Sequence, residues 1–213
     1  MPPVHLATSG PRRVADLVGR ASCAGCRAPV GPLCWACRNK VIPAPERAAP
    51  RSVERLLVPW SYANPVRGLV LDLKLRGLPA AALPLCEAMA SDVWGRGLAG
   101  SVLTWVPGRS TENRRRGYDH AEVLARGVAR LLGLPVRPLL RRVGPALDQT
   151  GLGAEERRKN LERVFSSRSA SEAVVLVDDV ITTGATLTAC ARALRAAGAH
   201  SVEALVACSA DSW

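Results

Sequence analysis

The segment VVLVDDVITTGAT, from Val174 to Thr186, places two adjacent acids between an apolar run and a loop of small residues. The apolar run is typical of a buried parallel strand, and the residues after Gly184 have helical spacing. In an open parallel sheet, ligands bind beyond the carboxyl ends of the strands. The N–H groups at the start of the following helix lack partners and attract a phosphate. The segment therefore predicts an anion site at this loop.

The two acids, Asp178 and Asp179, would repel a phosphate and must contact something else. Ribose hydroxyls or a ligand-bound Mg²⁺ are the natural candidates. Gly184 lets the backbone approach an anion closely, and the threonine hydroxyls around it add donors. The pattern therefore predicts a ribose 5-phosphate site. The alternative is a capped strand-to-helix turn, which does not require two acids, three threonines and a glycine.

Four of the seven cysteines form two C-x-x-C pairs near the start of the chain, Cys23 with Cys26 and Cys34 with Cys37. Two such pairs can converge on one tetrahedral ion, and Zn²⁺ held by four thiolates is a structural site. Disulfides are the alternative, but a cytosolic chain keeps its thiols reduced. A thioredoxin-like motif needs a single pair at a βα junction. The spacing therefore favours zinc, and Cys86, Cys190 and Cys208 are expected in the core.

Composition divides the chain into three parts. We expect a four-cysteine zinc module at residues 1–42, a linker rich in proline and alanine at 43–52, and an α/β domain at 53–213. The apolar runs are too short to span a bilayer, and the first twenty residues lack the apolar region of a signal peptide. A cytoplasmic location without a membrane span is the expectation.

Hydrophobic periodicity predicts the main elements of the α/β domain. Helices are expected over residues 66–75, 121–132, 154–165 and 185–197, and strands over 101–106, 173–177 and 201–208. A strand, a helix and a strand in this order form a βαβ unit, which predicts a parallel sheet with flanking helices.

Charge is the remaining signal from composition. The chain has 29 basic and 18 acidic residues, a net charge of +11 that favours polyanionic partners such as nucleic acid or phosphorylated metabolites. Solvated surface arginines are the alternative. Trp35, followed by Arg38 and Lys40, could stack on bases, although packing against the metal site is the favoured interpretation. The three histidines are scattered and are expected to be structural or exposed.

The segment from Val174 to Thr186 resembles the phosphoribosyl pyrophosphate (PRPP) motif of type I phosphoribosyltransferases. With the cysteine quartet added, the whole chain resembles the ComF family, which couples a zinc knuckle to such a domain. The resemblance extends to LKLRG at residues 73–77, RGY at 116–118 and QTGL at 149–152, followed by Arg157 and Asn160.

The resemblance implies a parallel-sheet type I phosphoribosyltransferase fold that binds PRPP or a nucleoside monophosphate together with Mg²⁺. Asp178 and Asp179 would hold the ribose hydroxyls and are the candidate catalytic residues. The residues that would wrap the 5-phosphate are Val180, Ile181, Thr182, Thr183, Gly184, Ala185 and Thr186. The residues that could meet the pyrophosphate are Lys74, Arg114, Arg115 and Arg116.

Two segments depart from the family pattern. The family usually reads VPVP where residues 105–108 read WVPG, and RGFNQ where residues 116–120 read RGYDH. An acid at Asp119 is expected to weaken anion binding nearby. As an enzyme, the protein would displace pyrophosphate from PRPP with a nitrogen of a nucleobase-like acceptor. The alternative is a non-catalytic ComF-type competence protein that binds single-stranded DNA or DNA-uptake proteins, or senses nucleotides.

Overall fold

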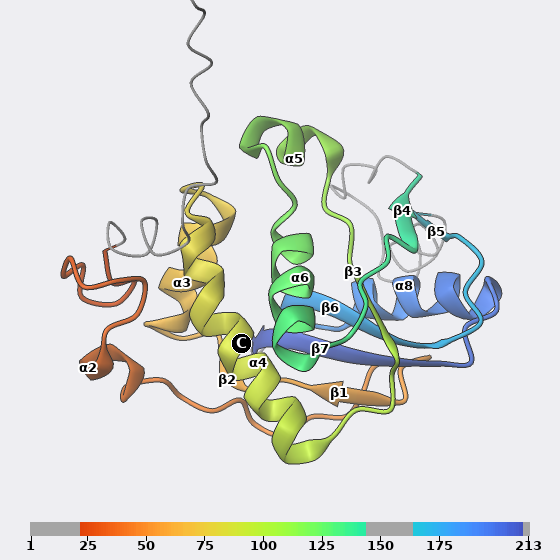
Figure 1. Cartoon of the computed structure of the whole chain (residues 1–213), viewed down its shortest axis with the longest axis horizontal. Coiled ribbons are helices and arrows are strands. Elements are labelled where there is room, and N and C mark those ends of the chain that lie inside the picture. Colours follow the sequence, from red (N-terminus) through yellow and green to blue (C-terminus); the bar gives the residue numbers. More distant parts are fainter. Residues whose placement is uncertain (1–21, 144–163, 211–213) are drawn as a thin grey trace, which may run out of the picture.

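The computed structural model describes residues 22–143 and 164–210 (Figure 1). Its centre is a parallel sheet of five strands in the order β1-β7-β6-β3, with β2 also paired to β7. The strands are β1 (Arg55–Leu57), β2 (Trp60–Ser61), β3 (Val102–Trp105), β6 (Ala173–Ile181) and β7 (Ser201–Ser209). The predicted parallel sheet is therefore confirmed.

Helices cover both faces of the sheet (Figure 1). Those on one face are α3 (Val66–Lys74), α4 (Ala82–Arg96) and α6 (His120–Leu132), and α8 (Ala185–Ala196) lies on the other. Side chains alternate along a strand, so Val175 and Val177 join the first core while Val174 and Leu176 join the second. Because β6 is buried on both faces, its first five residues, Ala173 to Val177, are apolar without interruption.

Most predicted elements are confirmed within one or two residues, but β6, α4 and the helix predicted over 154–165 are among those that differ. Strand β6 continues to Ile181, so Asp178 and Asp179 lie within the strand. Helix α4 was not predicted, although Pro84 lies in its first turn, where proline is tolerated. The helix predicted over 154–165 is wrong at Phe165, which begins β5 (Phe165–Ser167) and pairs with β4 (Leu140–Arg142).

Part of the sequence motifs falls outside the described residues. This applies to the rest of the helix predicted over 154–163, to QTGL at 149–152, and to Arg157 and Asn160. Among the helices that the structure describes, none combines the length and apolar character needed to cross a membrane.

The four-cysteine module, which contains the short helix α2 (Trp35–Arg38), lies against α3 (Figure 1). Ala24 is 5% exposed and belongs to the core beneath the helix. A Cβ atom on Gly68 would lie 2.5 Å from the Ala24 carbonyl oxygen, so only glycine permits this approach. Arg27 donates to both carboxylate oxygens of Asp72, at 3.2 and 3.1 Å. The module therefore packs on the helix that ends at Lys74.

Residues 43–52, which we call the strap, connect the module to β1. Pro43 forms an antiparallel bridge with Trp60, and the Ser61 hydroxyl donates to the Pro43 carbonyl at 2.9 Å. The Ala44 N–H donates to the Pro59 carbonyl at 3.1 Å. The strap thus has contacts with the sheet edge, while the domain boundaries at residues 42 and 52 stay predictions.

Candidate functional site

The candidate site lies where β3 and β6 end side by side, with Trp105 paired to Val177. The chain after β3 leads into α5 (Ser110–Arg116) and α6 on one face, whereas the chain after β6 leads into α8 on the other. Neighbouring connections that leave in opposite directions open a crevice at the carboxyl edge of a sheet, where such folds bind ligands. The topology therefore brings the predicted segments to one edge.

The two acids are buried and in contact with a lysine and a histidine. Asp178 is 9% exposed and Asp179 is 2% exposed. Asp178 Oδ1 accepts a hydrogen bond of 2.9 Å from the Asp179 N–H. Asp179 Oδ2 lies 2.8 Å from Lys74 Nζ and 3.0 Å from His120 Nε2. The structure thus brings Lys74 to the acid pair, and one ligand atom each of His120, Asp178 and Asp179 lies within 4.8 Å of the others.

The same surroundings shift the two carboxyl groups in opposite directions. Burial raises the pKa of Asp178 to about 7, and the adjacent charge of Asp179 adds to the effect. Burial would also raise the pKa of Asp179, but the contact with His120 and the charge of Lys74 outweigh it and lower the pKa. Below pH 7 the pair therefore offers one protonated donor beside one ionised acceptor, an arrangement suited to hydroxyl groups.

His120, one of the histidines predicted to be structural or exposed, contacts the acid pair. Its Nδ1 lies 3.1 Å from an Arg116 guanidinium nitrogen, and Arg116 is paired with Glu112 at 2.7 Å. A guanidinium only donates, so Nδ1 accepts and the ring hydrogen is on Nε2, the atom that lies 3.0 Å from Asp179 Oδ2. The sequence signal was the RGYDH segment, which departs from the family pattern at this residue.

The loop between β6 and α8 contains one buried residue, Gly184, and two threonines before it. Thr182 and Thr183 are exposed. Among the described residues, no group accepts the N–H of Thr183 or of Gly184. Gly184 has φ 77°, a backbone conformation that favours glycine. A Cβ atom there would also lie 2.6 Å from Pro50 Cγ, so both the conformation and the space require glycine at this position. Free amides at the start of a twelve-residue helix have the geometry that a phosphate needs.

The remaining predicted loop residues differ in what they can contribute. Ile181 is 2% exposed and packs in the second core, so its side chain is unavailable to a ligand. Val180 is half-buried and packs against the first core. Ala185 and Thr186 are half-buried in the first turn of α8, where the Ala185 N–H donates to Thr183 Oγ1 at 3.3 Å. Phosphate contacts here would come mainly from the backbone.

A pocket of about 790 Å³ lies at the end of β3, the strand paired with β6, and neither Asp178 nor Asp179 is among the residues that line it. Arg114 lines it together with Arg141 and Arg142, which the sequence analysis missed because they follow no recognised motif. Burial and the charge of Arg109 lower the pKa of Arg142. Of the arginines predicted to meet the pyrophosphate, only Arg114 lines this pocket. Arg115 is exposed and does not line it, and Arg116 contacts His120.

Asp119 lies at the wall of this pocket but is only 8% exposed. Its carboxylate accepts hydrogen bonds from the Gly108 N–H at 2.8 Å, Asn113 Nδ2 at 2.7 Å and the Ala121 N–H at 3.1 Å. The side chain therefore caps α6 and anchors the loop after β3. Three donors offset part of its charge, so its repulsion of a bound anion is smaller than its position in the sequence suggests.

The four cysteines of the module converge as predicted, with their sulfur atoms within 4.8 Å of one another. The Cys34 N–H donates to Cys23 Sγ and the Cys37 N–H donates to Cys34 Sγ, both at 3.4 Å. Burial would raise the pKa of Cys23, but backbone N–H groups directed at its sulfur lower it to about 6. The cluster thus fits a closed zinc site. Cys86, Cys190 and Cys208 are buried, as predicted.

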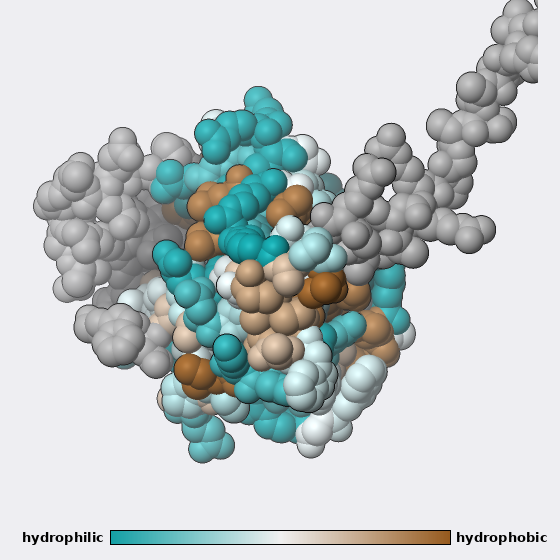
Figure 2. All heavy atoms as spheres, turned by 90° about the vertical axis from the view of Figure 1, so that its left-hand side faces the viewer, coloured by the Kyte–Doolittle hydropathy of each residue, from teal (hydrophilic) through white to brown (hydrophobic). Residues whose placement is uncertain are grey.

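Trp35 does not pack against the metal site, so the favoured interpretation of this residue is wrong. Its side chain is 78% exposed, while Cys37, two positions later on α2, is buried. Residues two positions apart on a helix point in different directions, so turning Cys37 inward turns Trp35 outward. Figure 2 shows the side of the molecule on which α2 lies, where hydrophilic and hydrophobic residues are interspersed.

Comparison with known proteins agrees with this geometry. Residues 120–212 match the family model of the phosphoribosyl transferase domain. Competence protein F of Haemophilus influenzae is 38% identical over 95 residues, which cover 42% of each chain. DNA utilization protein YhgH of Salmonella typhi is 29% identical over 164 residues, covering 73% of this chain and 72% of the relative.

A solved structure, the glutamine PRPP amidotransferase from B. subtilis complexed with ADP and GMP, is 23% identical with a TM-score of 0.43. It covers 61% of this chain, which spans 26% of that protein. The domain match, the parallel sheet and the clustered cysteines confirm the predicted fold class. The chain is a homologue of competence protein F and YhgH, in which a match to the phosphoribosyl transferase domain follows a four-cysteine cluster.

Proposed function

We propose that the protein binds PRPP or a nucleoside 5′-phosphate, with Mg²⁺, at the carboxyl edge of β6. The proposal is carried by one juxtaposition: the N–H groups of Thr183 and Gly184, which have no acceptor among the described residues, lie in the loop after the acid pair that Lys74 and His120 contact. The amides suit a 5-phosphate, and a donor beside an acceptor suits the ribose hydroxyls.

The neighbouring pocket suits the leaving group of a transfer reaction. A nitrogen of a nucleobase-like acceptor would form a bond to ribose C1 while the bond from C1 to the pyrophosphate oxygen breaks, and pyrophosphate would depart with the electron pair. Arg114, Arg141 and Arg142 would stabilise the charge that develops on it. Asp178 and Asp179 supply the oxygen ligands that Mg²⁺ prefers, and Mg²⁺ when bound would neutralise phosphate charge.

The binding prediction is tested by calorimetry on the full-length chain. PRPP is expected to bind more tightly with Mg²⁺ than without it, and ribose 5-phosphate is expected to bind more tightly than ribose because the loop amides contact the phosphate. If neither PRPP nor ribose 5-phosphate binds, the proposal is contradicted. Release of pyrophosphate with a panel of nucleobases would identify an enzyme, and binding without release would identify a nucleotide-binding competence protein.

The exposure of Trp35 favours a second candidate function, the binding of single-stranded DNA. Arg38, from the same helix, and Lys40 add positive charge near the indole ring, although Arg38 is paired with Glu87 at 2.8 Å. An exposed aromatic ring among basic residues can stack on a base. The names of both relatives also concern competence and DNA utilization.

We infer a cytoplasmic setting, because the thiolates of the module require a reducing compartment.

Trp35→Ala is expected to weaken binding of a fluorescent oligothymidylate by about 5-fold to 100-fold, since stacking contributes roughly 1–3 kcal/mol per base. Trp94→Ala is the matched control, because Trp94 is 67% exposed at the far end of α4. Fluorescence anisotropy at several salt concentrations measures both variants. Equal affinities for the two variants and the wild type would exclude Trp35 from DNA binding.

A further inference from the structure

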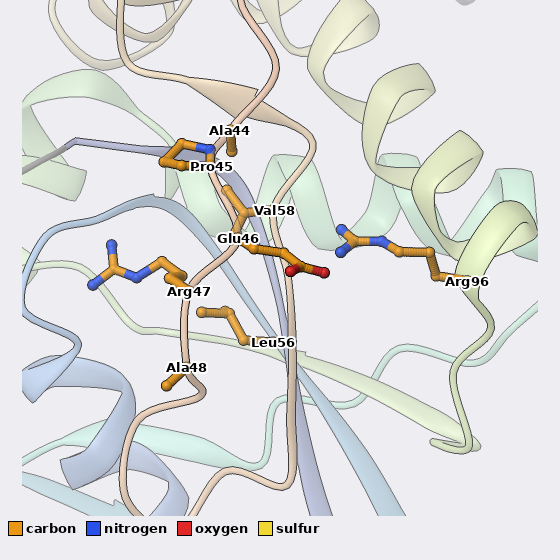
Figure 3. Close-up of a pocket in the computed structure, with 8 residues that line it drawn as sticks. All are labelled: Ala44, Pro45, Glu46, Arg47, Ala48, Leu56, Val58 and Arg96. Carbon is orange, nitrogen blue, oxygen red and sulfur yellow. The ribbon is translucent and has the colours of Figure 1, made fainter.

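The strap contacts the candidate phosphate loop through Arg47. One guanidinium nitrogen donates to the Thr182 carbonyl at 2.6 Å, and another donates to Ser209 Oγ at 2.8 Å. Thr182 follows the last residue of β6, and Ser209 is the last residue of β7. Figure 3 shows Arg47 pointing away from Glu46 and Arg96, which extend toward each other across a cavity of about 400 Å³ between the strap and β1. Arg47 also lines this cavity, but its guanidinium forms its hydrogen bonds at the carboxyl edge of the sheet.

The contact with Thr182 also determines where the next N–H group points. In a planar trans peptide, the carbonyl of Thr182 and the N–H of Thr183 point in opposite directions. Since the carbonyl faces Arg47, the N–H of Thr183 faces away from the strap. This N–H has no acceptor among the described residues, and the Thr183 side chain is exposed. Arg47 thus directs a free donor toward the open side of the loop.

Pro50 supports the other end of the same loop. The ring of Pro50 approaches Gly184 so closely that a Cβ atom there would lie 2.6 Å from Cγ and 3.0 Å from Cβ of the proline. The Pro50 carbonyl in turn accepts the Val53 N–H at 3.1 Å, which holds the proline close to the start of β1. The strap therefore contacts the loop at two residues, Thr182 through Arg47 and Gly184 through Pro50.

We propose that Arg47 is a positioning residue for the phosphate site: it holds the Thr182 carbonyl away from the anion and keeps the amide of Thr183 directed at it. The ligand in this inference is the one in the proposed function, on which it rests. Ser209 provides the second anchor for the planar guanidinium, so that a single orientation is maintained. A lysine at this position has one ammonium group and cannot reproduce both contacts with the same geometry.

The test compares Arg47→Ala with Arg51→Ala, a matched control that removes the same charge from an exposed residue of the strap. Arg51 makes no hydrogen bond or ion pair with any described residue. In the Arg47→Ala protein, affinity for ribose 5-phosphate is expected to fall roughly 10-fold to 100-fold, the range for a lost hydrogen bond to a charged group. Arg47→Lys should recover part of the loss, and Arg51→Ala should bind like the wild type.

A second measurement follows the backbone mobility of the loop in the absence of any ligand. The ¹⁵N heteronuclear NOE of Thr183 and Gly184 is expected to decrease in Arg47→Ala and to stay unchanged in Arg51→Ala. Unchanged NOE values in Arg47→Ala would overturn the inference, whether or not the sugar phosphate binds. Failure of the wild type to bind ribose 5-phosphate would instead overturn the proposed function, while equal binding by wild type and Arg47→Ala would overturn the role of Arg47.

Discussion

Asp178→Asn is expected to increase the free energy of unfolding of the ligand-free protein at pH 8 while reducing its affinity for PRPP. Burial raises the pKa of Asp178 from 3.8 to about 7 in the folded state. Between these values the folded protein holds a proton that the unfolded chain releases, so stability falls as the pH rises through this window. Above pH 7 the cost is complete, on the order of 4 kcal/mol at about 1.4 kcal/mol per pKa unit. Asparagine removes this cost and can still accept the Asp179 N–H.

Asp179→Asn is the matched control and should have the opposite effect. Contacts with His120 and Lys74 lower the pKa of Asp179, so its carboxylate contributes stability above the unfolded pKa, which is lost as the pH falls through the folded value. The substitution leaves Lys74 without its partner and should destabilise the protein at pH 8. Urea unfolding at pH 4, 6 and 8 measures both variants. A destabilised Asp178→Asn protein at pH 8 would contradict the assignment of the buried cost to Asp178.

Cys26→Ser is expected to abolish metal binding and to lower the free energy of unfolding by several kcal/mol. Cys26 is exposed, so the serine itself removes little buried surface, and the loss would come from the missing fourth thiolate. Wild-type protein should contain one zinc ion per chain by native mass spectrometry, and a strong chelator should lower its Tm.

The chelator provides the control for this prediction. It should leave the Tm of Cys26→Ser unchanged, because that protein no longer has a complete site to lose. Cys86→Ala, which removes a buried thiol outside the cluster, should be destabilised by its cavity but should keep its zinc. Zinc retained at one ion per chain in Cys26→Ser would contradict the four-cysteine site.

The parts of the site that could be predicted from the sequence are local ones. A continuous apolar run, two acids and a threonine-glycine loop lie within thirteen residues, so β6, the loop and α8 could be predicted together. The cysteine cluster could be predicted for the same reason, because its ligands lie within fifteen residues. Spacing over such short distances leaves few geometries open to the chain.

The contacts that complete the site could not be predicted, because they depend on packing between distant segments. Arg47 and Thr182 are 135 residues apart, and no local pattern marks them as partners. His120 reaches Asp179 only because α6 begins beside the end of β6. The error at Trp35 has a different, local origin: Cys37 lies two positions later on α2 and faces the cluster, which turns Trp35 outward.

The seating of the Ala24 carbonyl on Gly68 has a consequence for dissecting the protein. The helix under that carbonyl carries Lys74 at its last position, in contact with Asp179. A truncated chain that starts after the cysteine module would bare the surface beneath Ala24 and leave Asp72 without Arg27. Such a fragment would therefore be a poor stand-in for the intact transferase-type domain, and swaps with relatives should exchange the module and α3 as one piece.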